Sequence, residues 1–246
     1  MPLVAARSLV LQSFPYGETS KILRLFTREL GVRSVIAKGA LRPKNRFGGV
    51  LEPFTEGTAH FYLKEGRDLH TLSGFDLLRS RQGLGRDLAG FAGASLLAEL
   101  VLRFATEEPH EALYRAVDEA MDEILAARGE GTERAALAGV WHVVSLLGFA
   151  PQTEMCVTCG RPLDPDEPVR FDAGGGGAAC RDCRPSGRVL DPATRAELGE
   201  MLGGAAPEAF SGARTAHREL LRAYVGAQLA QERPLRSLEL FLQQLP

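Results

Sequence analysis

The four cysteines of this 246-residue chain lie in one segment, and their spacing is the strongest chemical signal in the sequence. Cys156 and Cys159 form one C-x-x-C pair, and Cys180 and Cys183 form a second after twenty intervening residues. Two such pairs at this distance are typical of a tetrahedral thiolate site for zinc, since each short turn points two sulfurs at one ion. We therefore predict one structural Zn²⁺ per chain, bound by all four cysteines. A four-cysteine site is closed and leaves no position for a catalytic water.

Other interpretations of these cysteines are weaker. Disulfides are rare in cytoplasmic proteins, and a redox C-x-x-C pair needs a βαβ setting that the surrounding sequence lacks. Zinc deaminases carry H-x-E ahead of P-C-x-x-C, whereas His217-Arg218-Glu219 follows the cysteines and no proline precedes either pair. The sequence also contains no P-loop, G-x-S-x-G or G-x-G-x-x-G motif. We therefore predict that the protein is not an enzyme. The alternative is a zinc hydrolase or deaminase, which a closed four-cysteine site does not favour.

The start of the chain has no basic segment ahead of an apolar run, so no signal peptide is expected. The longest nearly apolar run, 135–150, is shorter than the roughly 18–20 residues that span a bilayer. We therefore expect a cytoplasmic protein without membrane contact.

The formal net charge of −2 conceals two blocks of opposite sign. Residues 1–50 contain nine Lys and Arg against two acidic residues, whereas residues 84–150 contain five against eleven. Blocks of one sign indicate partners better than the total does. The basic block suits a polyanion such as nucleic acid, although a solvated basic face is the alternative. The acidic block is predicted to contact partner proteins, with Asp118-Glu119 and Asp122-Glu123 as a solvated helix face.

The candidate nucleic-acid contacts lie in this basic block, where no acidic residue occurs between Glu29 and Glu52. Basic loops interleaved with aromatic side chains bind single strands, because cations neutralise phosphates and rings stack on bases. The spacing of Phe26, Phe61 and Phe75 predicts core positions. The predicted contacts are Arg24, Arg33, Lys38, Arg42, Lys44 and Arg46, with Tyr16 and Phe47 in turns as the stacking residues.

Alternating apolar residues predict that the first part of the chain is a β-barrel. The expected strands are 4–14, 20–28, 32–38, 55–63 and 69–78, with a glycine- and proline-rich loop at 39–53. Five strands in about 75 residues suit a small closed barrel, and the OB-fold is the common five-stranded solution. OB-folds typically bind oligonucleotides.

Helical periodicity dominates the rest of the chain. The expected helices are 87–105, 109–128, 132–147, 191–202, 213–231 and 235–245. We therefore predict an α+β, multi-domain protein. An OB-fold barrel occupies residues 1–80, and an α-helical domain occupies 81–246 with the four-cysteine zinc module inserted at about 151–188.

Several motifs, in this order, resemble the RecO family of bacterial DNA repair and recombination mediators. The chain departs from many relatives at Val140-Trp141-His142, where they carry a Phe-Glu pair. The motifs that carry the resemblance are Leu9-Val10-Leu11, Tyr16-Gly17-Glu18-Thr19-Ser20-Lys21, Leu25–Gly31, Ala37–Gly49, Leu51–Phe54, Glu99-Leu100 and Leu146–Pro151, which leads into Cys156.

The resemblance implies an OB-fold followed by a helical domain with a zinc module. It also implies a protein that binds single- and double-stranded DNA and anneals complementary strands. Such proteins act with RecR, and often RecF, to load RecA onto strands coated by single-strand-binding protein, so the expected localisation is cytoplasmic and nucleoid-associated. Arg103, Arg115 and Arg128 are the candidates for contacting the tail of single-strand-binding protein. An RNA-binding OB-fold and zinc-module protein of translation remains the alternative.

Overall fold

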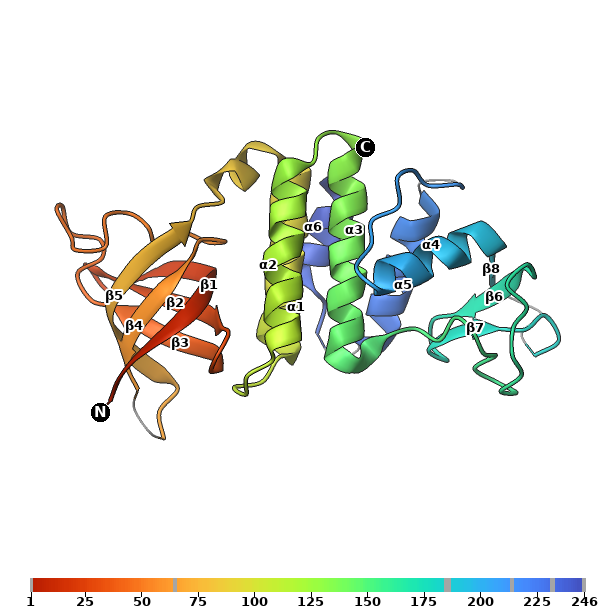
Figure 1. The fold of residues 1–246 in the computed structure, drawn as a ribbon, viewed down its shortest axis with the longest axis horizontal. Helices are drawn as coiled ribbons and strands as arrows, with labels where there is room; N and C mark the ends of the chain where they lie inside the picture. Colours follow the sequence, from red (N-terminus) through yellow and green to blue (C-terminus); the bar gives the residue numbers. More distant parts are fainter. Residues whose placement is uncertain (1, 64–65, 184–186, 213–214, 231–232, 245–246) are drawn as a thin grey trace.

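The computed structural model describes residues 2–63, 66–183, 187–212, 215–230 and 233–244. Its first part is a closed five-stranded barrel with the strand order β1-β2-β3-β5-β4 (Figure 1). Strands β3 and β5 run parallel, and every other neighbouring pair in the barrel is antiparallel. The predicted OB-fold barrel is thereby confirmed. The strands are β1 Leu3–Tyr16, β2 Ser20–Thr27, β3 Gly31–Ala37, β4 Glu56–Tyr62 and β5 Leu69–Arg79.

Within the described residues, six α-helices follow the barrel, as predicted. A 3-10 turn at Gln82–Arg86 leads into the first of them, and none of the described helices is long and apolar enough to cross a bilayer. The expected helix limits at 213, 231 and 245 lie outside the described residues. The helices are α1 Leu88–Phe104, α2 Glu111–Ala126, α3 Glu130–Val144, α4 Pro192–Leu202, α5 Thr215–Gln228 and α6 Arg236–Gln244.

The barrel wall is apolar on both sides where it meets the helices. Leu23, Leu25 and Val35 point into the barrel, whereas Phe26 and Val32 belong to the core that the helices form. This arrangement follows from the period of two along each strand, which places successive side chains on opposite faces. One face of β2 and β3 therefore closes the barrel core, and part of the other face joins the barrel to the helical domain.

Aromatic contacts and a glycine fix how closely the two parts approach. The Phe26 ring lies 5.6 Å from that of Tyr114 on α2, measured between centroids. Gly31, with a φ of 67°, faces the α1–α2 loop, and a Cβ atom there would lie 2.5 Å from the Glu108 carbonyl oxygen. The turn between β2 and β3 can therefore dock on this loop only with glycine at this position. The Val32 N–H then donates to the Thr106 carbonyl at 3.1 Å.

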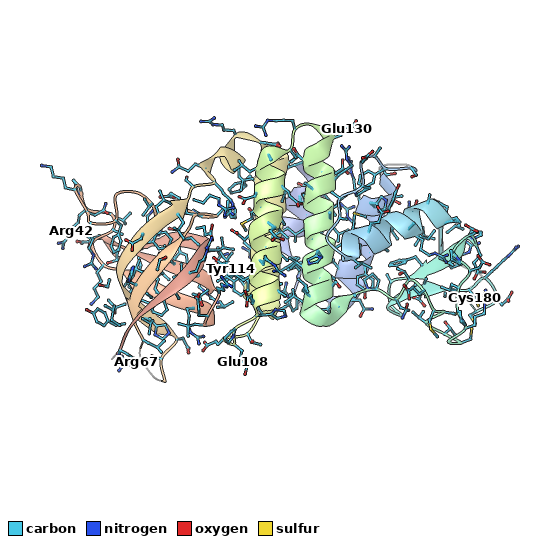
Figure 2. The ribbon with its side chains drawn as sticks, in the orientation of Figure 1. Arg42, Arg67, Glu108, Tyr114, Glu130 and Cys180 are labelled. Atoms are coloured by element: carbon cyan, nitrogen blue, oxygen red, sulfur yellow. The ribbon has the colours of Figure 1, made fainter. Side chains whose placement is uncertain are left out.

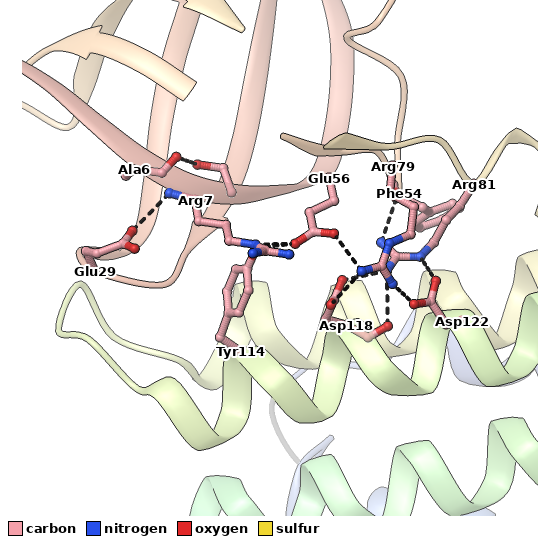
Figure 3. A network of polar contacts seen from close by, with 11 residues as sticks. Ala6, Arg7, Glu29, Phe54, Glu56, Arg79, Arg81, Tyr114, Asp118 and Asp122 are labelled. Carbon is pink, nitrogen blue, oxygen red and sulfur yellow. Dashed lines mark hydrogen bonds and ion pairs between the residues drawn. The ribbon is translucent and has the colours of Figure 1, made fainter. Parts of the chain in front are cut away.

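A buried arginine provides the polar part of this junction (Figure 3). The Arg81 side chain is fully buried, and its Nε donates to Asp122 Oδ1 at 2.7 Å. Its Nη2 donates to Asp118 Oδ1 at 2.5 Å, and its Nη1 donates to the Phe54 carbonyl at 3.2 Å. The prediction that Asp118 and Asp122 lie on a solvated face is therefore wrong, because both carboxylates neutralise a guanidinium that the barrel buries against α2.

Further arginines of the barrel are paired at the same junction. Glu56, also fully buried, accepts from Arg7 Nε at 2.6 Å and lies 3.3 Å from Arg79 Nη2. Two more pairs join the turn after β2 and strand β3 to the helical domain: Arg28 with Glu111, and Arg33 Nη1 with Glu107 Oε2 at 2.8 Å. Four of the eleven acidic residues in the block predicted to face partner proteins therefore pair with basic residues of the barrel or of the turn after it.

Breaking this buried pairing should destabilise the protein strongly. In an Asp118→Asn, Asp122→Asn double variant, the Arg81 guanidinium stays buried without a formal counter-charge. We expect the free energy of unfolding, measured by urea titration, to fall by about 3–5 kcal/mol. The matched control is Glu119→Gln on the same helix, whose side chain is 64% exposed. It should change the free energy by no more than about 0.5 kcal/mol, as surface substitutions usually do. Equal stability of the double variant and the control would contradict this role for Arg81.

Candidate metal centre and nucleic-acid interface

The four cysteines come together in a small module inserted between α3 and α4. A three-stranded sheet of order β7-β6-β8 supports it, with β6 at Val169–Asp172, β7 at Gly177–Ala179 and β8 at Arg188–Leu190. The four sulfur atoms all lie within 4.8 Å of one another. The predicted clustering of all four cysteines is confirmed, and the site could hold a metal ion.

Backbone N–H groups in the two cysteine turns donate to the sulfur atoms and favour the thiolate form that binds a cation. The Cys180 N–H donates to Cys156 Sγ at 3.3 Å. Burial opposes ionisation of Cys156, but N–H groups of Cys180, Cys159 and Thr158 outweigh it and lower the pKa of the thiol to about 6. The sulfurs of Cys180 and Cys159 instead favour protonated Cys183 and raise its pKa to about 12. Neighbouring thiols that cannot all ionise together are a donor set suited to a metal cation.

The module is attached to the helical domain through its apolar side. Cys156 and Cys180 are 2% exposed and belong to the same core as Phe171 and Leu190. Gly177 allows the segment before the first cysteine turn to approach β7, because a Cβ atom there would lie 2.2 Å from the Gln152 carbonyl oxygen. Figure 2 shows Cys180 at the end of the molecule opposite to Arg42 on the barrel. The cysteine cluster and the basic barrel loop are thus far apart.

On the barrel, the strand registers align a row of outward side chains. Phe14 pairs with Ile22, Ile22 with Ile36, Ile36 with Thr71, Thr71 with Tyr62, and Tyr62 with Leu3. Phe14 is 41% exposed, Tyr62 39% and Leu3 54%, so both ends of the row remain open to solvent. We call these six residues the outer row. Exposed aromatic and aliphatic side chains on the outer face of an OB barrel are suited to contact with bases.

The structure removes Phe47 from the predicted stacking residues. Its ring is 4% exposed and packs in the barrel core, so no face is free for a base. The loop at 39–53 folds back to close one end of the barrel, and Asn45 Oδ1 accepts from the Phe47 N–H at 2.9 Å. The prediction for Phe47 is wrong because a turn position does not imply exposure. Tyr16, the other predicted stacking residue, is 53% exposed at the end of β1.

The predicted cations fall into two groups. Lys38, Arg42 and Lys44 are exposed on the loop, and none has a carboxylate partner among the described residues. We call these three the free loop cations. Arg46 is exposed too, but its Nη2 donates to the Leu72 carbonyl at 3.1 Å and its guanidinium lies 4.9 Å from the Phe47 ring centroid.

The two predicted cations on the strands differ. Arg24 lies half-buried on β2, opposite Gln12 and Ser34. Arg33 is only 14% exposed and is held by Glu107 of the α1–α2 loop. Arg33 is therefore an interdomain residue, and its predicted contact with nucleic acid does not fit its position.

Phe14 and Tyr62 are exposed aromatic residues that are absent from the predicted contacts. Strand alternation is the signal that could have found Tyr62, because it follows inward-facing Phe61 by one residue. For Phe14 the same signal misleads, since a bulge between Val10 and Gln12 reverses the facing of the residues that follow. Sequence alternation counted from buried Val10 therefore places Phe14 inside the barrel.

The chain thus combines an OB barrel with a helical domain and a four-cysteine cluster that could hold a metal ion. Two family models match the chain: Recombination protein O N terminal over residues 1–81 and Recombination protein O C terminal over residues 85–239. Together they account for most of its length. The chain belongs to the recombination protein O family.

Individual relatives agree with the family models. A DNA repair protein RecO of Anaeromyxobacter sp. (strain K) is 34% identical over 248 residues, covering 95% of this chain and 96% of the relative. Proteins of the same name from Anaeromyxobacter dehalogenans (strain 2CP-1) and Rubrobacter xylanophilus are each 34% identical, over 92% of both chains in each comparison. Membership of this family supports a role in DNA repair and recombination.

Removing one cysteine ligand should release the metal and loosen the module. A Cys180→Ser variant is expected to hold well below one metal ion per chain, measured by elemental analysis, and to melt at a lower temperature. The reason is that metal binding supplies folding energy to a small module with few apolar residues. Thr158→Ala, an exposed position within the first cysteine turn, is the control and should keep its metal. A full metal ion in the Cys180→Ser variant would contradict the ligand assignment.

Proposed function

We propose that this chain is a non-catalytic DNA-binding protein that acts as a recombination mediator. The observation that carries the proposal is that two of the free loop cations, Lys38 and Arg42, line one cleft with Ile36 of the outer row on an OB barrel. The proposal covers binding of single- and double-stranded DNA and annealing of complementary strands. We also propose that the protein acts in the cytoplasm, associated with the nucleoid, since that is where such a ligand is found.

Annealing by such a surface requires no acid, base or nucleophile. Two DNA strands repel each other, and a cationic loop that contacts their phosphates releases counterions and lowers that repulsion. Base pairing then selects the complementary strand. The outer row supports this reaction by contacting the bases of one strand. Two further cations complete the proposed interface: Arg24, half-buried on β2, and Arg46, in the loop after β3.

The proposed partners are RecR and RecF, together with single-strand-binding protein and, indirectly, RecA. Of the three arginines proposed for the tail of single-strand-binding protein, two are engaged with backbone carbonyls. Arg103 donates to the Arg233 carbonyl at 2.7 Å, and Arg128 donates to the Ala127 carbonyl at 2.6 Å. Arg115 is 69% exposed and 3.9 Å from Glu119. Its availability supports Arg115 as the tail contact, which a pull-down with Arg115→Ala tests directly.

For the metal centre we propose Zn²⁺, bound by Cys156, Cys159, Cys180 and Cys183. Four thiolate sulfurs form the donor set that structural zinc sites favour. Zinc in such sites is bound tetrahedrally, and two C-x-x-C turns can supply that arrangement. With all four positions taken by protein, the ion would stabilise the module and would offer no site for substrate. Elemental analysis of the purified protein identifies the ion.

The loop cations are tested by the salt dependence of DNA binding. In a Lys38→Ala, Arg42→Ala, Lys44→Ala triple variant, single-strand affinity should fall for every sequence tested. The slope of log affinity against log salt should flatten by about 2 units, since each lost phosphate contact on a single strand removes about 0.7. Fluorescence anisotropy with labelled oligonucleotides measures both quantities. The triple variant should fold normally, because these side chains are exposed.

The matched control removes three exposed arginines from the helical domain, in an Arg86→Ala, Arg115→Ala, Arg222→Ala variant. Its net charge changes equally, but its slope should stay within experimental error of the original. Unchanged single-strand affinity in the loop variant would overturn the proposed interface. Tighter binding of RNA than of DNA of the same sequence would instead favour a role in translation.

A further inference from the structure

A cleft of about 410 Å³ opens at the end of the barrel that carries the free loop cations. Its walls come from the β1–β2 turn on one side and from the end of β3 and the loop that follows on the other. Tyr16 and Ile36 supply apolar surface, and Lys38 and Arg42 supply positive charge. Glu18 is the one carboxylate among the lining residues. The volume falls in the range of about 300–1,000 Å³ that small-molecule sites occupy.

Backbone hydrogen bonds hold the two walls in place. The Leu41 N–H donates to the Thr19 carbonyl at 2.9 Å, which ties the loop to the β1–β2 turn. Within the loop, the Arg42 N–H donates to the Gly39 carbonyl at 3.1 Å. Phe47, buried in the barrel core, anchors the far part of the same loop. The cleft is therefore formed before a ligand arrives, which reduces the entropy that binding must overcome.

We propose that this cleft binds one unpaired nucleotide of a DNA strand, a more specific claim that rests on the proposed function. The base lies against the Tyr16 ring and Ile36, and Lys38 and Arg42 contact the adjoining phosphates. Tyr16 is suited to this role because it is an aromatic residue that lines the cleft and is 53% exposed. Arg42 offers a planar guanidinium for a phosphate, and Lys38 offers a mobile point charge.

This assignment gives the barrel a means of telling single strands from duplexes. A base inside a duplex is stacked and paired, and entering the cleft would cost its unstacking energy. A base in a single strand enters without that cost. The phosphate contacts of Lys44 and Arg46 outside the cleft are available to either form. The cleft therefore adds affinity for single strands only.

The test uses the full-length protein and a short oligothymidine with one 2-aminopurine, whose emission is quenched when the base stacks on an aromatic ring. The original protein should quench the probe, and Tyr16→Phe should keep the quenching. Tyr16→Leu should lose it and weaken single-strand binding by about 5- to 150-fold, the loss expected for one stacked base. Duplex affinity should stay within about twofold, because the duplex never enters the cleft. The control is Phe91→Leu on α1, an aromatic residue 37% exposed outside the proposed interface, which should change neither the quenching nor the single-strand affinity.

Two outcomes would overturn the cleft assignment. One is unchanged quenching and affinity in Tyr16→Leu while the triple variant of the loop cations still weakens binding, which would leave the proposed function standing. The other is an equal loss of single-strand and duplex affinity in Tyr16→Leu, which would make Tyr16 a general DNA contact. A normal melting temperature of Tyr16→Leu excludes unfolding as the cause of any loss.

Discussion

Docking of the barrel on α2 buries the guanidinium of Arg81, and this interaction determines which cations of the molecule can meet a ligand. A buried charge is stable only when it is paired, and Asp118 and Asp122 supply the pairing. The same junction engages further barrel arginines, namely Arg7, Arg28, Arg33 and Arg79. The free loop cations lie away from this junction, in the loop after β3 on the side of the barrel where Figure 2 shows Arg42.

The regular elements could be predicted from the sequence because each follows from a local pattern. Alternating apolar residues mark the five strands, and Asp191 before Pro192 marks the start of α4, where Asp191 Oδ1 accepts from the Thr194 N–H at 2.9 Å. The cysteine cluster was predictable for the same reason, since each C-x-x-C pair is a local turn. Counting charges could not show which acidic residues of the helical domain pair with arginines of the barrel. Asp118 was expected in solvent because its helix is acidic, and only the docked barrel reveals its partner.

The proposed DNA-binding surface was harder to predict, because it depends on contacts between strands and loops. A bulge in β1 turns Phe14 outward, and no sequence pattern predicts the position of this bulge. Phe47 lies in a turn, where exposure is the natural expectation, yet the loop folds inward and buries it. Tyr16 and the free loop cations were selected correctly as exposed residues, but the cleft that joins them depends on a hydrogen bond between two loops, from Leu41 to Thr19. Local patterns identify the residue types, and tertiary contacts decide which of them share a site.

The barrel loop as the main DNA contact is the central claim, and lysine footprinting tests it most directly. All four lysines of the chain lie in its first 64 residues, and Lys21, paired with Glu52 at 2.8 Å, provides an internal reference. The full-length protein would be acetylated with and without a single-stranded oligonucleotide, and the modification of each lysine measured by mass spectrometry. The account predicts that DNA protects Lys38 and Lys44 and leaves the reactivity of Lys21 unchanged. Equal acetylation of Lys38 and Lys44 with and without bound DNA would contradict it.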